Sequence, residues 1–352
     1  MKMLAKLLEQ DGMREMLFQE VLTKSSGMFL VASLQLDMLG SCLNIRDLRA
    51  GLEQLPKGVE AMYASTMERI EHQADPSLAK LALVWLVHAL ESMTIDDLRH
   101  ALAFDPVRSK YDPELLVDAD SLVSVCCGLI TLEPQSKLVR LVHYTAKDFL
   151  EPYLRNDYPE PHDLIASSCI AYLMHCGFHD MQDNIPGDYE DSIFDENQFL
   201  GYSHRQWAPH SRLCTSVPPA TADFIFQCRH FPIFEEDYDL LDSGSLHVAE
   251  AYGLQTLLRD WFDQSRSSSF ALLHNLDVNA RTDYGYTPLH FASRLGHTET
   301  VRVLLDVEGI DVHYPDIRGI TPLMIASENG HVETVKLLLA VVDIEHVNAT
   351  NN

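Results

Sequence analysis

The chain has 352 residues, of which 46% are hydrophobic, so it is long enough for about two or three domains with a sizeable core. Asp and Glu number 52 against 26 Lys and Arg, which gives a formal net charge of -26 at pH 7. A field of this sign repels phosphate backbones and anionic lipid. The composition therefore disfavours nucleic-acid and membrane-surface functions. It fits protein partners with basic patches, or a surface whose acid is only solubilising.

The N-terminal stretch MKMLAKLLEQDGMREM carries charges throughout and predicts an amphipathic helix rather than a secretory signal. The longest apolar run, at 81–90, is too short to span a bilayer. Seven cysteines without a CxxC pair favour a reducing compartment and mostly buried thiols. We therefore expect a cytoplasmic protein without a membrane partner.

Residues 1–75 predict a helical region. Asn44 has the side chain and position of a helix N-cap, and Pro56 follows the end of the same helix. The apolar stretch 27–39 predicts a helix buried on most sides. A later helix carries one apolar face, made by Val59, Met62, Tyr63, Met67 and Ile70.

Residues 76–153 predict a winged-helix domain: three helices, a β-hairpin and a closing helix. The second helix follows Thr94, which forms a capping-box pattern with Asp97. The third ends at Gly128, a residue suited to left-handed backbone. The hairpin consists of LITLE, the turn PQSK and LVRLVHY, and Thr145 stands near the cap of the closing helix.

Winged helices often bind DNA through the third helix, but the charge of this one opposes DNA binding. The span 112–128 contains four carboxylates and no Lys or Arg. A helix of this charge would be repelled by phosphates in a DNA groove. We therefore expect no nucleic-acid partner.

Residues 154–243 predict a helical linker region. One helix ends at Gly177, and two more are expected around 199–212 and 219–229. Between them, seven carboxylates and no basic residue occupy 180–196. This acidic stretch predicts a solvated loop.

Residues 244–352 contain internal repeats. GYTPLHFASRLGHTETVRVLL and GITPLMIASENGHVETVKLLL are two copies, with Thr287 and Thr321 34 residues apart. Proline suits the first helical turn in each copy, and Gly296 and Gly330 suit left-handed helix ends. The T-P-L-H-x-A pattern resembles the ankyrin repeat family. A weaker copy stands at 244–262, and another could begin near 342.

The ankyrin resemblance implies an α-solenoid whose concave face, made of finger tips and first helices, binds a protein partner. We interpret His247 and His290 as structural residues that form hydrogen bonds between neighbouring turns. The finger-tip residues expected to contact the partner are Asp283, Tyr284, Tyr286, Asp316 and Arg318. The expected fold class is therefore mainly α, with a helical region and a winged-helix domain followed by ankyrin repeats.

The first half of the chain resembles the part that follows the nucleotide-binding core in fungal-type NACHT proteins of the STAND class. Residues 27–40 and 121–150 carry this resemblance most clearly. It implies a signalling, innate-immunity-like protein in which the winged helix folds over bound nucleotide. It also implies that His143, where the hairpin joins the closing helix, contacts the phosphates of ADP.

The sequence departs from that class because it contains no GxxxxGK[ST] phosphate loop and no acidic Mg²⁺-binding strand. We expect the chain to begin after the NTPase core, which another chain could carry. Two interpretations of His143 stay open: an ADP sensor, or a capping or hydrogen-bonded residue at a domain joint. In this chain a lone imidazole without a backbone nest binds phosphate weakly.

The sequence shows no HExxH, EF-hand or GxSxG pattern, and neither the His175–His179 stretch nor Cys228 with His230 has metal-site spacing. We expect no catalytic residue, no metal and no cofactor. The leading hypothesis is a non-enzymatic protein-interaction module. The alternatives are the regulatory half of an ADP/ATP switch and a substrate adaptor for degradation.

Overall fold

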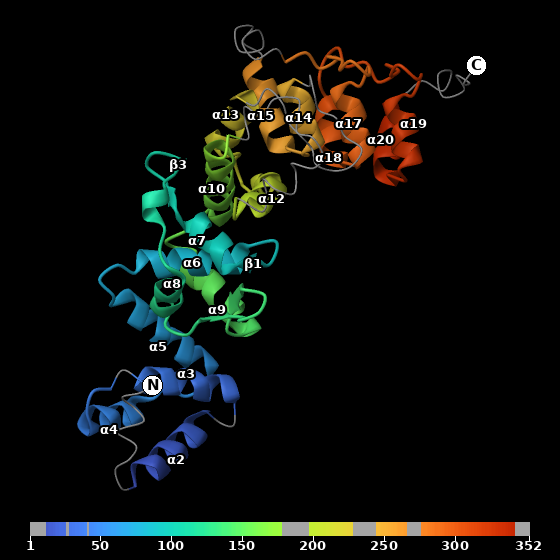
Figure 1. Cartoon of the computed structure of the whole chain (residues 1–352). Helices are drawn as coiled ribbons and strands as arrows, with labels where there is room; N and C mark the ends of the chain where they lie inside the picture. The colour runs from blue at the N-terminus through green and yellow to red at the C-terminus, as the bar shows by residue number, and fades with distance from the viewer. Residues whose placement is uncertain are drawn as a thin grey trace. The chain divides into compact units, whose positions relative to one another are not determined.

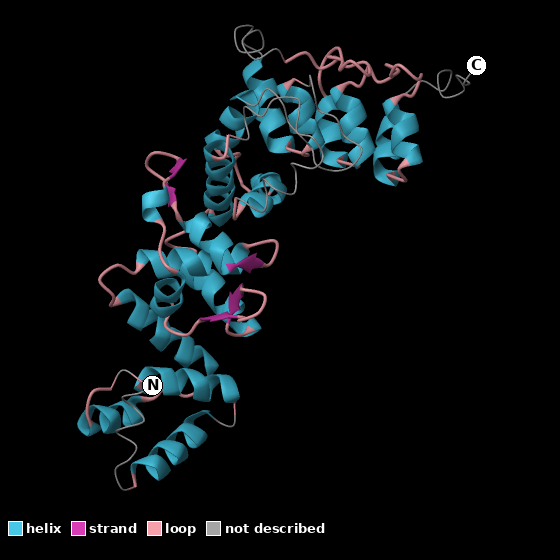
Figure 2. Cartoon of the chain, viewed as in Figure 1, coloured by secondary structure: helices cyan, strands magenta, loops and turns pink. Residues whose placement is uncertain are grey.

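The computed structural model describes residues 12–25, 28–40, 42–177, 197–227, 244–265 and 276–341. Their contacts divide the chain into a first unit, Met1–Phe104 with Asp112–Pro161, and a second unit, Asp105–Tyr111 with His162–Asn352. Helices dominate both units and strands are short, which confirms the mainly α fold class (Figures 1 and 2). The boundaries of the four predicted regions stay predictions.

Some predicted features lie outside the described residues. They are most of the N-terminal amphipathic helix, the acidic stretch 180–196, residues His179, Cys228 and His230, and the possible repeat start near 342.

The first unit begins with α2 (Met13–Ser25), α3 (Phe29–Leu39), α4 (Ile45–Gln54) and α5 (Val59–Glu71). Asn44 caps α4 as predicted, because its side chain accepts the Asp47 N–H at 2.9 Å. The predicted face of α5 is confirmed for four of its five residues, since Met62, Tyr63, Met67 and Ile70 are fully buried and Val59 is half-buried.

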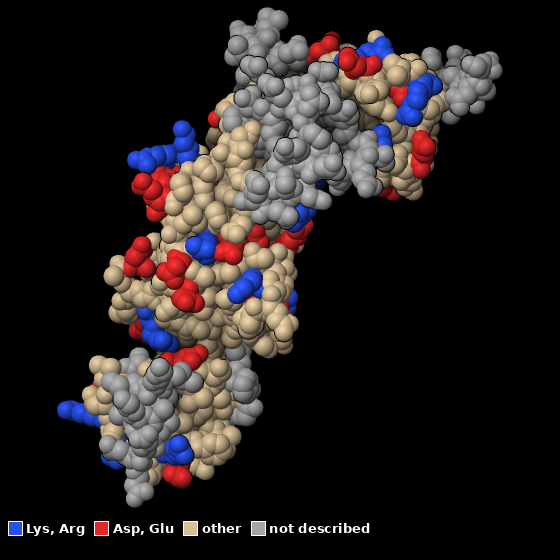
Figure 3. Space-filling model, in the orientation of Figure 1, with Lys and Arg blue, Asp and Glu red and all other residues tan. Residues whose placement is uncertain are grey.

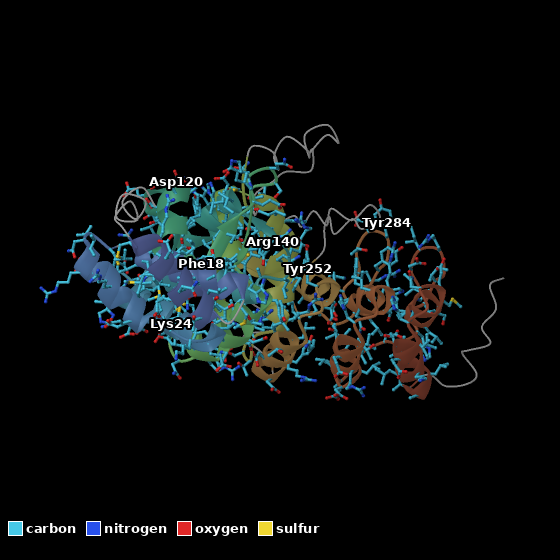
Figure 4. The ribbon with its side chains drawn as sticks, turned by 90° about the horizontal axis from the view of Figure 1, so that it is seen from below. Phe18, Lys24, Asp120, Arg140, Tyr252 and Tyr284 are labelled. Carbon is cyan, nitrogen blue, oxygen red and sulfur yellow. The ribbon has the colours of Figure 1, made fainter. Side chains whose placement is uncertain are left out.

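The other end of α4 is held by a buried cation. Lys24 of α2 is 9% exposed, and its amine donates to the Leu52 and Glu53 carbonyls, the latter at 2.8 Å. A cation at a helix C-terminus offsets the partial negative charge of the unpaired carbonyls. Lys24, labelled in Figure 4, therefore fastens α2 to α4.

The elements of the winged helix follow in the predicted order. They are α6 (Ser77–His88), β1 (Met93–Thr94), α7 (Ile95–Leu102), a 3₁₀ turn (Pro113–Leu115), α8 (Ala119–Val125), β4 (Ile130–Leu132), β5 (Leu138–Leu141) and α9 (Tyr144–Leu154). The capping box is complete, because the Asp97 N–H donates to Thr94 Oγ1 at 3.1 Å and the Thr94 N–H donates to Asp97 Oδ2 at 2.8 Å. Two further short strands, β2 (Phe104–Asp105) and β3 (Lys110–Tyr111), form a separate pair.

The predicted hairpin is one side of a three-stranded antiparallel sheet of order β1-β5-β4. Its register pairs Ile130 with Leu141 and Met93 with Val139. Met93, Ile130 and Val139 are buried, so one face of this small sheet belongs to the core. The strand β1 was not expected, because a strand of two residues, the second of them the cap of α7, carries no strand periodicity.

The third helix is shorter than predicted. It ends at Val125 rather than at Gly128. Cys127 has φ 51° and Gly128 has φ 87°, so both residues lie in the left-handed region and the helix cannot continue through them.

The second unit contains α10 (Pro161–His175), α12 (Leu200–Arg212), α13 (Pro219–Gln227), α14 (Ser245–Ala251), α15 (Gln255–Ser265), α17 (Pro288–Leu295), α18 (Thr298–Leu305), α19 (Pro322–Glu328) and α20 (Val332–Val341). The helices α14, α17 and α19 pack in one row, and α15, α18 and α20 pack in a second row (Figure 1). The weak copy at 244–262 therefore forms a helix pair of the same stack. Loops run along one edge of the stack (Figure 2).

One carboxyl group is buried in this stack without a hydrogen-bond partner among the described residues. Glu250 of α14 is fully buried, and within the described part of the chain neither of its side-chain oxygens has a hydrogen-bond partner. Burial raises the pKa of Glu250 well above its usual value, so folding favours the protonated form of this group. Its ionisation in the unfolded chain therefore destabilises the stack at neutral pH.

We predict that Glu250→Gln raises the thermal midpoint of the second unit more at pH 8 than at pH 5. The folded-state pKa lies above the unfolded value of about 4.3, so the stability due to Glu250 is present below that value and is lost as the pH rises. Glutamine cannot ionise and avoids this loss. Thermal unfolding at both pH values measures the effect, and an equal shift at the two would contradict it.

Candidate functional site

The loops at the edge of the stack form two matching fingers. In the first, the Thr282 N–H donates to the Tyr286 carbonyl at 3.0 Å, and the Gly285 N–H donates to the Thr282 carbonyl at 2.8 Å. Asp316, Gly319 and Ile320 make the equivalent bonds in the second finger. The two fingers are joined directly, because the Ile317 N–H donates to the Tyr284 carbonyl at 3.2 Å.

A histidine at the fourth position of the T-P-L-H pattern links two of the repeats to the next finger, whereas the second clear copy has Met324 at this position. His290 Nδ1 accepts the Thr287 N–H at 3.1 Å, and its Nε2 lies 3.1 Å from the Ile320 carbonyl oxygen. Because Nδ1 accepts, the neutral ring carries its proton on Nε2 and donates it to that carbonyl. His247 repeats this arrangement with the Ala280 carbonyl at 3.0 Å. These bonds confirm the structural interpretation of both residues.

A second set of imidazoles links each of these helix pairs to the preceding one, and no sequence-based prediction included it. His297 Nε2 lies 2.9 Å from the Ala251 carbonyl oxygen, and His331 Nε2 lies 2.8 Å from the Arg294 carbonyl oxygen. A Cβ atom on Gly296 would lie 2.4 Å from His331 Nδ1, so the ring requires glycine there. The repeated Gly-His pair in the two clear copies was the available signal.

The predicted finger-tip residues differ in exposure. Tyr284 is 52% exposed and lies at the outer end of its finger (Figure 4), while Asp283 and Arg318 are exposed and Tyr286 is half-buried. The Arg318 guanidinium donates to Tyr286 Oη at 2.8 Å, which ties the two fingers together through side chains as well.

Asp316 differs from its expected place at the surface. It is only 4% exposed, and its Oδ1 accepts the backbone N–H groups of Arg318 and Ile320, both at 2.8 Å. Its carboxylate therefore shapes the second finger, and the residue does not present it to solvent. An aspartate that accepts N–H groups two and four residues ahead commonly stabilises a turn. In this finger that local role buries the side chain, although its position in the repeat suggested exposure.

Three residues near the finger tips, Ile317, Arg281 and Tyr314, were missing from the predicted set. Ile317 is 66% exposed, directly beside the Tyr284 backbone. The Arg281 guanidinium lies 4.7 Å from the centre of the Tyr314 ring and donates to the Pro315 carbonyl at 3.2 Å. Only the packing of one finger on the next brings these side chains together, so spacing within one repeat could not find them.

His143 caps α9 in the first unit. Its Nδ1 lies 3.4 Å from the Thr145 N–H nitrogen and 2.9 Å from Thr145 Oγ1. Thr145 Oγ1 in turn lies 3.0 Å from Tyr63 Oη. The predicted cap near Thr145 is thus made by His143, with Thr145 as its partner. Because Nδ1 accepts, the neutral ring carries its proton on Nε2, which has no hydrogen-bond partner among the described residues.

The described cysteines are buried or half-buried thiols. Burial raises the pKa of Cys126 to about 12 and that of Cys176 to about 11, so neither is a thiolate at neutral pH. Among the described residues, His, Cys, Asp and Glu side chains form no group of three or more that could hold a metal ion. In the same residues, no helix is both long enough and apolar enough to cross a bilayer.

The excess of acid does not by itself mark a binding face. On the face shown in Figure 3, Asp and Glu side chains of the first unit lie among Lys and Arg side chains rather than in one patch. A binding surface therefore has to be identified from shape and from particular residues.

Fold and finger geometry define a repeat protein of the kind that binds other proteins. Residues 263–351 match the family described as "Ankyrin repeats (3 copies)". Residues 66–158 match the family described as "GPI inositol-deacylase, winged helix domain". The chain therefore contains ankyrin repeats and a winged-helix domain, and ankyrin repeats are an architecture for protein–protein interaction.

Among curated proteins, the chain is similar to the vegetative incompatibility protein HET-E-1 of Podospora anserina. The two are 30% identical over 105 residues, which is 30% of this chain and 7% of that protein. The chain thus spans a small part of the length of this relative.

We predict that His290→Met destabilises the ankyrin stack by about 1–3 kcal/mol, because the Thr287 N–H and the Ile320 carbonyl lose their shared partner. Burial lowers the pKa of His290 below the unfolded value of about 6.5. The unfolded chain then binds more protons, so the stability due to this ring is present above that value and declines as the pH falls.

Denaturant unfolding at pH 7.5 and pH 5.5 tests this prediction. The stability difference between the wild-type protein and His290→Met should shrink at the lower pH. A matched exchange, His72→Met, changes an exposed ring at the C-terminal end of α5 whose Nδ1 lies 2.7 Å from the Glu68 carbonyl oxygen, and it should have little effect. A difference that is constant or grows at acid pH would contradict the role of the neutral ring.

Proposed function

We propose that this chain is a non-enzymatic interaction module whose finger edge binds a protein partner. The finger edge is the surface made by Asp283, Tyr284, Tyr286, Ile317 and Arg318. The proposal includes no cofactor and no catalytic step. Free cysteines among the described residues support action in a reducing, cytoplasmic compartment.

The observation that carries this proposal is the pair of exposed side chains on adjoining fingers. Tyr284 is 52% exposed and Ile317 is 66% exposed, and the backbone bond of 3.2 Å between these residues fixes their spacing. Tyrosine and arginine are frequent hot-spot residues at protein interfaces. Because the fingers are already ordered by their own hydrogen bonds, binding would cost little conformational entropy.

We propose in addition that the first unit is the regulatory part of a STAND-type signalling protein. The winged-helix match and the similarity to a protein named for vegetative incompatibility support this proposal. In this proposal the winged helix packs against a nucleotide-binding core, which another chain could supply.

We predict that the double substitution Tyr284→Ala and Ile317→Ala weakens partner binding by at least about 100-fold, since each residue would be a hot spot of about 2 kcal/mol. The partner is first isolated by affinity capture on the full chain, and its binding is then measured by calorimetry with purified components. Val332→Ala is a matched control because Val332 is 61% exposed on helix α20. Unchanged affinity of the double variant would overturn the assignment of the finger edge.

The second candidate function is a nucleotide-dependent switch in which His143 contacts ADP phosphates. One observation favours it: the cap on α9 uses Nδ1 and leaves the Nε2 proton without a partner in the described part of the chain. A neutral imidazole with this tautomer can donate to a phosphate oxygen.

Titration of the full chain with ADP and with ATP by calorimetry tests the switch. It predicts ADP binding tighter than about 100 µM, with at least about tenfold loss in His143→Ala and little change in His72→Ala. Heat indistinguishable from dilution up to millimolar ADP would reject the switch and leave the interaction module as it stands.

A further inference from the structure

A groove runs between α5 and α9 in the first unit. It has a volume of about 660 Å³, and its lining includes Glu60 and Tyr63 from α5 and Asp148, Phe149 and Tyr153 from α9. This volume lies within the range of small-ligand pockets, which is about 300–1,000 Å³. None of the functions proposed above uses this groove.

Aromatic rings form its floor and one wall. Tyr63 is fully buried at the floor, with its ring centre 5.5 Å from that of Phe149. Phe149 and Tyr153 are half-buried and stacked, with ring centres 5.7 Å apart and planes 26° apart. Nearly parallel rings of half-buried aromatic residues are good partners for a flat cation.

Two carboxylates complete the lining. Glu60 and Asp148 are exposed, and neither side chain has a hydrogen-bond or ion-pair partner within the described residues. Among the described residues that line the groove there is no Lys or Arg. The groove is therefore both aromatic and negatively charged.

Lys80, which pairs with a carboxylate that holds Tyr153, already has its own charge partners. Lys80 lies 2.8 Å from Asp157 and 3.2 Å from Glu71, so its charge is already compensated. Glu71 also accepts the Tyr153 hydroxyl at 2.9 Å. This network holds the Tyr153 ring in place as part of the groove wall.

We propose that this groove binds one arginine side chain of a protein partner. The guanidinium would stack on the rings of Phe149 and Tyr153 and pair with Asp148 and Glu60. A diphosphate would be repelled by the two carboxylates, and an apolar side chain would desolvate them without compensation. A lysine would gain the charge attraction but not the stacking of a planar group. The site is separate from the finger edge and does not depend on it.

An NMR titration of the full chain tests this assignment. The probe is the acetylated and amidated pentapeptide Ala-Ala-Arg-Ala-Ala, and the readout is the ring signals of Phe149 and Tyr153. We expect these signals to shift and saturate with the arginine peptide. A citrulline peptide, which keeps the planar shape without the charge, should bind at least about fivefold more weakly, and added salt should weaken arginine binding.

Charge variants separate the groove from the general acidity of the chain. Glu60→Gln with Asp148→Asn should weaken arginine binding at least about fivefold. The matched control, Glu68→Gln with Asp120→Asn, removes the same charge at exposed positions of the first unit that do not line the groove (Asp120 is labelled in Figure 4), and should stay within about twofold. Equal weakening in the two double variants, equal binding of citrulline, or unmoved ring signals would each overturn the proposal.

Discussion

The hydrogen bond from a buried, neutral imidazole to the carbonyl of the next finger is the interaction on which the ankyrin part depends. In His290 one ring satisfies a backbone N–H of its own repeat and a carbonyl of the following one, at 3.1 Å each. Burial lowers the pKa of His247 and His290, so both rings stay in the form that can make these two bonds. These imidazole bonds thus contribute to the stability of the stack, to its pH dependence and to the spacing of the fingers.

The sequence predicted most reliably those interactions that join residues close together in the chain. The cap by Asn44, the capping box of Thr94 and the T-P-L-H turns involve residues three or four positions apart, and the structure confirms them. It was least informative where distant segments meet. The strand β1, the burial of Asp316 and the groove between α5 and α9 depend on packing partners that no short spacing reveals.

The structure shows His143 as the cap of α9, and this cap occupies only one of the two ring nitrogens. Capping engages Nδ1 through Thr145, and phosphate contact would engage Nε2. The hydroxyl of Tyr63 connects this cap to the floor of the arginine groove, since Tyr63 Oη lies 3.0 Å from Thr145 Oγ1. The first unit therefore offers a donor and an acidic aromatic groove on the same pair of helices, with opposite preferences for ligand charge.

The central claim is that the finger edge is an ordered surface held in place by the imidazole bonds. Amide hydrogen exchange at Ile317 and Ile320 tests it most directly, because these N–H groups donate to the Tyr284 carbonyl and to Asp316 Oδ1. Our account predicts protection comparable to that of the amides in α17, and loss of that protection in His290→Met. Exchange of these two amides at the rate of an unfolded chain in the wild-type protein would contradict it.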